Sequence, residues 1–132
     1  MAKCKVLAFL LCDNATRDRD GKITLHGLFD RIIAPKTRNE VRLFYAYYRV
    51  VVEEPCVVFM KVAGPEGFEV PGNWRDSLTG RGPMQTVWAL SSELFKLQGS
   101  YSLELRQEAD DSEPLTLAQM SLTVEESEDH SK

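Results

Sequence analysis

The stretch LLCDNATRDRDGKITLHGLFDRII, residues Leu10–Ile33, decides how the rest of the chain is interpreted. An apolar run ends at Cys12, a polar turn region follows over Asp13–Lys22, and a largely alternating run returns over Ile23–Ile33. The polar region contains Asp20-Gly21, a dipeptide that accepts the positive φ angles of tight hairpin turns. The pattern therefore predicts one β-hairpin whose second strand continues to residue 33.

Two details refine this hairpin. The first strand, predicted over Lys5–Cys12, is continuously apolar, which is typical of a central strand covered on both faces. Gly27 lies inside the second strand, where a glycine indicates a β-bulge or the close approach of another backbone.

The remaining chain shows short β-type runs separated by turn signals, and no long amphipathic helix. Further strands are predicted over Val41–Val52, Val57–Ala63, Phe68–Val70, Met84–Leu90, Gly99–Arg106 and Leu115–Val124. The first two of these are expected to pair as a hairpin across Glu53-Glu54-Pro55. The pattern predicts an all-β protein, an antiparallel β-sandwich of about seven to eight strands, immunoglobulin-like or C2-like, with a closed β-barrel as the alternative.

The run Gly99–Arg106 alternates cleanly, with Tyr101, Leu103 and Leu105 pointing inward. A buried tyrosine at the start of a late sandwich strand often bonds back to the preceding corner. The cysteine that follows such a tyrosine in antibody domains is absent here. A single domain is expected over residues 1–124, followed by a disordered acidic tail over 125–132.

The composition of the chain argues against several classes of function. The 132 residues carry a formal net charge of −4, which argues against a nucleic-acid partner. No apolar run approaches the roughly 18–20 residues of a membrane helix, and the apolar start is interpreted as a strand and not as a signal peptide. Three cysteines without a C-x-x-C spacing favour buried, reduced thiols over a disulfide or metal site, and hence a cytoplasmic protein.

The acidic turn is a candidate cation site. Asp13, Asp18 and Asp20 are close in sequence, and Ca²⁺ requires several converging oxygen ligands. Thr16-x-Asp18-x-Asp20-Gly21 partly resembles the start of an EF-hand loop, but position twelve of that loop would be Gly27. The favoured interpretation is a solvated turn whose aspartates cap local backbone groups.

The sequence contains few of the residue patterns that are typical of enzymes. There is no P-loop, no G-x-G-x-x-G, no Gly-x-Ser-x-Gly and no Cys/His signature. His26, on the second predicted strand, is the most defensible general base, although a hydrogen-bonded strand histidine is favoured. We expect no cofactor and no enzymatic activity.

The segment Pro71–Pro83 is the strongest candidate for partner binding. It carries Trp74, Arg75 and Arg81 among glycines and prolines, and Trp and Arg are favoured at interfaces. The competing interpretation is that Trp74 folds back over one end of the sandwich. The aromatic run from Phe44 to Tyr48 presents rings on both faces, which indicates either a central covered strand or a surface for a homo-oligomer.

The hairpin residues also resemble a family of small bacterial domains of unknown function. Its members share a pattern similar to Leu11-Cys12-Asp13, Asp20-Gly21-Lys22 and Leu25-x-Gly27-Leu28-Phe29-Asp30-Arg31-Ile32, with a later Gly64-Pro65-x-Gly67 and Gly99-x-Tyr101-x-Leu103. The resemblance spans residues 5–124 and implies a bacterial cytosolic β-sandwich. It implies no activity and no functional residues.

The sequence therefore leaves three functions open. A non-enzymatic β-sandwich that binds a protein partner is the leading hypothesis, with no nucleic acid and no membrane involved. A cation- or small-ligand-binding sandwich that uses the first hairpin is the alternative. An enzyme of unrecognised type is the third.

Overall fold

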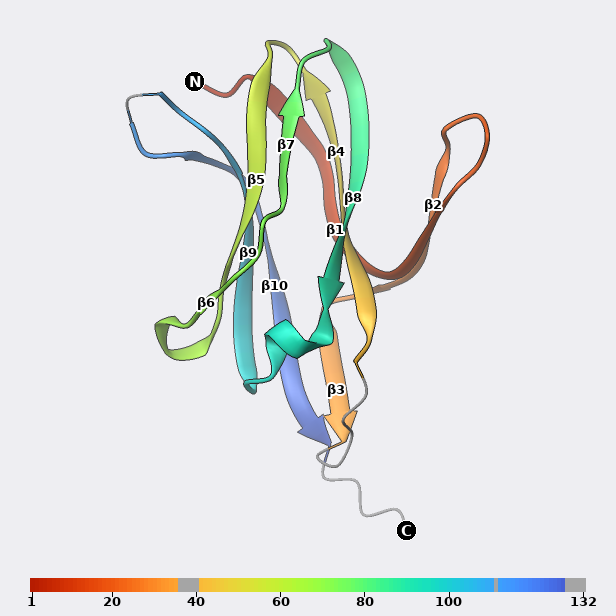
Figure 1. The fold of residues 1–132 in the computed structure, drawn as a ribbon, viewed down its shortest axis with the longest axis vertical. Helices are drawn as coiled ribbons and strands as arrows, with labels where there is room; N and C mark the ends of the chain where they lie inside the picture. The colour runs from red at the N-terminus through yellow and green to blue at the C-terminus, as the bar shows by residue number, and fades with distance from the viewer. Residues whose placement is uncertain (36–40, 111, 128–132) are drawn as a thin grey trace.

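The computed structural model describes residues 1–35, 41–110 and 112–127 as two packed β-sheets (Figure 1). The four-stranded sheet has the order β2 (Ile23–Phe29), β1 (Cys4–Arg17), β4 (Leu43–Val52), β8 (Gly82–Ser91). The other sheet has the order β3 (Arg31–Pro35), β10 (Leu115–Ser127), β9 (Gly99–Gln107), β5 (Cys56–Ala63), β6 (Glu69–Val70), and β7 (Arg75–Leu78) also pairs with β5. Two short 3-10 helices, η1 (Pro65–Gly67) and η2 (Ser92–Phe95), lie in connections.

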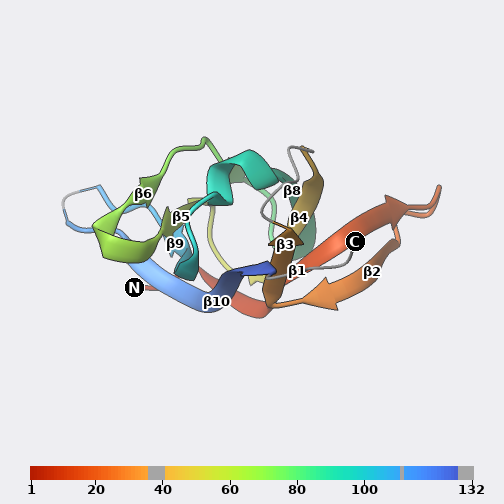
Figure 2. The same cartoon turned by 90° about the horizontal axis from the view of Figure 1, so that it is seen from below.

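The sandwich prediction is confirmed, and the closed barrel is wrong, because the two sheets remain separate (Figure 2). The described residues form ten strands, more than the seven to eight predicted. The additional elements come from β7, which lies inside the segment expected to be irregular, and from the division of the second predicted strand into β2 and β3.

The core lies between the sheets and is built by alternating side chains. On β9, Tyr101, Leu103 and Leu105 are fully buried, as the alternation predicts. The side chains that the facing strand β4 contributes to this core are Phe44, Ala46, Tyr48, Val50 and Val52. Because β-strand side chains alternate between faces, Tyr45 and Tyr47 point to the outer face of the four-stranded sheet.

Tyr101 closes the corner that precedes β9. Its hydroxyl donates a hydrogen bond of 2.8 Å to the backbone oxygen of Leu97, four residues earlier. Burial raises the pKa of Tyr101, and the bond to this backbone oxygen opposes that shift. The predicted bond from a buried tyrosine to the corner is therefore present.

The expected hairpin between the third and fourth predicted strands is wrong. β4 and β5 belong to different sheets, so the Glu53-Glu54-Pro55 connection crosses the sandwich. The Lys3 backbone oxygen accepts hydrogen bonds from the N–H groups of Glu53 and Glu54, at 2.9 and 3.0 Å. Three residues can make either a hairpin turn or a crossing, and the long-range pairings of the two strands decide which one forms.

The second predicted strand divides at Asp30. β2 pairs antiparallel with β1, whereas β3 pairs parallel with the last residues of β10, in the opposite sheet. The N–H of Thr123 donates to the Asp30 backbone oxygen at 2.9 Å, at the point where the chain changes sheets. The hairpin turn is also shorter than expected, because residues 13–17 belong to β1.

Gly27 provides a close approach and not a bulge. The β1–β2 register continues past it without a shift, and its φ is +69°. A Cβ at this position would collide with the carboxylate of Asp13 on the neighbouring strand. The group that approaches Gly27 closely is therefore the Asp13 side chain, whereas the sequence predicted the backbone of another segment.

Both ends of the domain differ in detail from expectation. β10 continues to Ser127, where residues 123–127 pair with β3, so residues 125–127 are strand and not disordered tail. Residues 128–132 of the predicted tail lie outside the described part of the chain. β1 is central in its sheet but is not covered on both faces, since Leu7 and Leu10 are 51% and 37% exposed.

Candidate interaction groove

The acidic side chains of the first hairpin contact different partners. The Asp13 carboxylate accepts from Arg42 at 2.6 Å. Asp18 accepts from the backbone N–H groups of Asp20 and Lys22, both at 2.9 Å, and so stabilises the turn. Among residues 1–35, 41–110 and 112–127, no group of three His, Cys, Asp or Glu side chains is placed to hold a metal ion. The structure thus does not bring Asp13, Asp18 and Asp20 together, and cation binding stays a prediction.

His26 is exposed on β2, opposite Asn14. Within the described residues it makes no hydrogen bond or ion pair, so no carboxylate orients its ring. A general base usually requires such an orienting partner and a nearby nucleophile.

Trp74 lies in the core cluster and is only 9% exposed. Its Nε1–H donates to the backbone oxygen of Ala89 on β8 at 3.0 Å. Its ring occupies the space that a Cβ of Gly72 would need. Trp74 therefore connects the edges of the two sheets, as the fold-back interpretation expects, and offers little surface to a partner.

The two arginines of the same segment are exposed. Arg75 pairs with Glu108 at 2.8 Å, in an exposed ion pair that contributes about 0–1 kcal/mol. Arg81 lies directly before β8, and no partner for it is seen among the described residues. Their part in binding stays a prediction.

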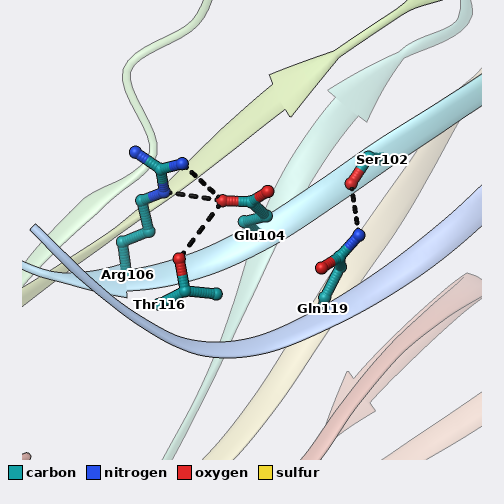
Figure 3. A network of polar contacts seen from close by, with 5 residues as sticks. All are labelled: Ser102, Glu104, Arg106, Thr116 and Gln119. Carbon is teal, nitrogen blue, oxygen red and sulfur yellow. Dashed lines mark hydrogen bonds and ion pairs between the residues drawn. The ribbon is translucent and has the colours of Figure 1, made fainter.

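The outer face of the six-stranded sheet is polar and internally paired (Figure 3). Arg106 donates to one oxygen of Glu104 from Nε at 2.7 Å and contacts it from Nη2 at 2.6 Å, and the Thr116 hydroxyl reaches the same oxygen at 3.3 Å. Beside them, the Gln119 amide donates to the Ser102 hydroxyl at 2.9 Å. A surface whose polar groups are satisfied by one another is well suited to face water.

The outer face of the four-stranded sheet differs in chemistry. Tyr47 pairs with Leu10, and Tyr45 pairs with Cys12, which in turn pairs with Leu28 of β2. Leu10 and Leu28 are 37% and 60% exposed. This face therefore exposes two leucines, whereas Tyr47 and Cys12 beside them are buried. Exposed apolar side chains that lie together are typical of contact surfaces.

The β1–β2 hairpin borders this face. Beyond Cys12, β1 leaves β4 and continues with β2 alone, and the pair projects from the sandwich (Figure 1). The tip returns toward β8, where the Gln85 amide donates to the Gly21 backbone oxygen at 3.4 Å. The same Gln85 side chain accepts from the Tyr47 hydroxyl at 2.5 Å. A chain of two hydrogen bonds thus connects β4, β8 and the hairpin tip.

An open groove of about 390 Å³ lies between the hairpin and β8. Its lining residues are Ala15, Thr16, Arg17, Ile23, Tyr45, Thr86, Val87 and Ala89. Arg17 is the charged residue of this lining, and among the described residues it makes no ion pair. The groove therefore combines apolar walls and one tyrosine ring with an unneutralised cation. We call it the hairpin groove.

β8 is the edge of the four-stranded sheet at the end opposite β2 in strand order, and its residues Val87 and Ala89 line the hairpin groove. It pairs with β4 over its whole length, and within the described chain no strand pairs with its other side. Its sequence, GPMQTVWALS, contains no charged residue. Natural edge strands are commonly protected by charges, bulges or covering segments, because an unpaired edge can bind another strand.

Sequence reasoning missed the hairpin groove because its lining comes from three separate segments. The signals that it did have were the aromatic run in β4 and the uncharged run in β8. Neither signal shows that the hairpin tip lies beside β8, since that placement is seen only in the contact of Gln85 with the turn.

Comparison with known proteins supports the fold class. No protein-family model matches the chain, and no curated protein matches it. Among solved structures, the C-terminal domain of wzt is similar, with a TM-score of 0.55 and 12% identity over 96% of this chain and 76% of that chain. At this identity the likeness shows a shared β-sandwich fold. Membership in the bacterial family stays a prediction.

Two other solved structures are similar at lower TM-scores. An immunoglobulin-like protein from Pseudomonas aeruginosa has a TM-score of 0.46 and 12% identity, over 93% of this chain and 97% of that chain. A CARDB domain from Pyrococcus furiosus, solved with two metal ions, has a TM-score of 0.44 and 10% identity, over 91% of this chain and 94% of that chain.

The described residues contain no helix long and apolar enough to cross a membrane.

Proposed function

We propose that this β-sandwich is a non-catalytic module that binds a partner protein in the hairpin groove. The observation that carries the proposal is the contrast between the two outer faces. The six-stranded face is polar and self-paired, whereas the four-stranded face exposes Leu10 and Leu28, is hollowed by a groove of about 390 Å³, and is bordered by an unpaired edge strand. We further propose a bacterial cytoplasmic setting, on the basis of the family resemblance.

The chemistry of the groove supports binding over catalysis. Its lining offers two threonine hydroxyls, one tyrosine and one arginine, with no histidine, cysteine or carboxylate beside them. Nucleophilic and acid–base mechanisms require such a pair of groups in hydrogen-bond reach of each other. The apolar walls and the tyrosine ring instead supply the contact area that stabilises protein interfaces.

Site-specific photo-crosslinking in cells that naturally make the protein tests this function. A photoreactive residue is placed at Thr16, in the groove, and a control residue at Gln119, on the polar sheet. We expect Thr16 to crosslink to a defined protein and Gln119 to give no such product. The purified crosslinked protein is then expected to bind the isolated module in solution.

Two matched variants locate the surface. Ala89→Arg fills the groove from an exposed strand position and should abolish the crosslink, whereas Gln119→Arg makes the same change on the other sheet and should leave it intact. Equal crosslinking by both variants, or a product formed from Gln119 alone, would contradict the assignment of the binding surface to the hairpin groove.

A further inference from the structure

The backbone of β8 indicates what kind of partner segment the groove accepts. In an antiparallel ladder, the N–H and C=O of one residue point to the same side, and successive residues point to opposite sides. The Ala89 oxygen accepts from Trp74, which lies across the open side of β8. The same alternation places the backbone groups of Val87 and Gln85 on that open edge. These groups can pair with an added strand.

Two contacts lie beside the open edge. Trp74 covers it at Ala89, and the hairpin tip lies over the outer face at Gln85, whose side-chain amide bonds to Gly21. At about 3.3 Å per residue, these two positions are about 13 Å apart. The occupant is therefore a short extended segment, because a longer strand would have to displace Trp74.

The groove gives this segment a charge preference. Side chains on the outer face of an added strand would lie beside those of Val87 and Ala89, on the face that Ile23 and Arg17 border across the hairpin groove. The first three offer apolar contacts, and Arg17 offers a guanidinium that has no carboxylate partner among the described residues. An acidic side chain in the segment would gain a charge-assisted, bidentate pair there.

We propose that the partner contributes a short extended segment that adds to β8 as an antiparallel or parallel strand, with an apolar side chain in the hairpin groove and an acidic side chain on Arg17. This inference rests on the proposed function and names the class of partner. Backbone pairing at a sheet edge supplies affinity in this mode, and the side-chain pockets supply specificity.

A second copy of the chain fits this site less well. Edge-to-edge pairing would place β8 of one molecule against β8 of another, and β8 has no acidic residue to meet Arg17. Such a dimer would leave two guanidinium groups without partners at one interface. The charge of the groove therefore favours an acidic segment from a different protein.

Peptide selection against the purified protein tests the inference. The probe is a phage-displayed library of random peptides, followed by calorimetric titration with the selected peptide in synthetic form. We expect enriched peptides to alternate apolar or β-branched residues with polar ones and to share an acidic residue. Enrichment of helical or proline-rich sequences without an acidic residue would overturn the proposed mode.

Protein variants then test the two contacts. Val87→Pro removes an N–H on the open edge, a change that edge strands tolerate, and should weaken the selected peptide at least tenfold. Arg17→Gln should weaken it about tenfold, with the loss reduced at high salt, while Arg19→Gln in the exposed turn should have no effect. Unchanged affinity in both Val87→Pro and Arg17→Gln would overturn the inference.

Backbone methylation of the peptide provides a test that does not depend on the stability of a variant. N-methylation should abolish binding at alternate peptide positions, those whose N–H faces β8, and should be tolerated at the positions between them. A uniform effect of methylation would refute strand addition. The proposed function itself fails separately, if Thr16 gives no protein crosslink, so the two failures are distinguishable.

Discussion

Replacing Trp74 measures how much the contact between the two sheet edges stabilises the fold. Truncation of a buried tryptophan to alanine costs about 3–5 kcal/mol, because the lost contacts leave a cavity. The unfolding entropy is about 2.1 cal/mol/K per residue, or about 0.28 kcal/mol/K for 132 residues. Trp74→Ala should therefore lower the melting temperature by about 11–18 °C, measured by circular dichroism.

A second variant at this position separates packing from hydrogen bonding. Trp74→Phe keeps an aromatic ring but removes the donor to the Ala89 oxygen, which should cost about 1–2 kcal/mol, or about 4–7 °C. Arg81→Ala, an exposed change in the same segment, should stay within about 0.5 kcal/mol of wild type. A Trp74→Ala protein that melts within 2 °C of wild type would refute the core role that the burial of Trp74 indicates.

Three further predictions concern other parts of the fold. Tyr101→Phe removes the hydroxyl bond to the corner and should lower the free energy of unfolding by about 1 kcal/mol in urea titration; no change would mean that water replaces the bond fully. Gly27→Ala combines a φ of +69° with a collision against Asp13, so it should cost more than the roughly 1 kcal/mol of the backbone term alone, and a neutral result would contradict the close approach. Burial and the adjacent Cys56 raise the pKa of Cys4 from 9.0 to about 12, so the unfolded thiol ionises first and stability falls as pH rises above 9. This group should make the protein about 1 kcal/mol less stable at pH 10 than at pH 8, and Cys4→Ala should lose that part of the pH dependence.

Local patterns predicted the parts of the structure that depend on neighbours in sequence. The alternation around Tyr101 placed this ring in the core, and its distance from the preceding corner allowed the hydroxyl bond to Leu97. The Asp20-Gly21 dipeptide predicted the turn of the first hairpin, and Asp18 caps the backbone of that same turn. Such features need only a few residues to be in place.

Local sequence patterns did not predict which of the two sheets each strand joins. The segment Glu53-Glu54-Pro55 is typical of a hairpin turn. It nevertheless crosses the sandwich, because β4 and β5 pair with strands that are far away in sequence. Tryptophan is a residue type that is common at interfaces, and only the contact of Trp74 with Ala89 shows that this side chain belongs to the core. The hairpin groove has the same origin, because its walls are brought together by long-range pairing and by the bend of the hairpin.

The parallel pairing of β3 with the end of β10 has a consequence for folding during synthesis. Arg31 pairs with Thr123, so β3 emerges from the ribosome about ninety residues before its partner exists. Until then β3 has no sheet to join, and its apolar residues are available to other chains or to chaperones. Closing so long a loop is entropically costly and slows folding. We expect completion of β10 to be the step that commits the nascent chain to its native topology.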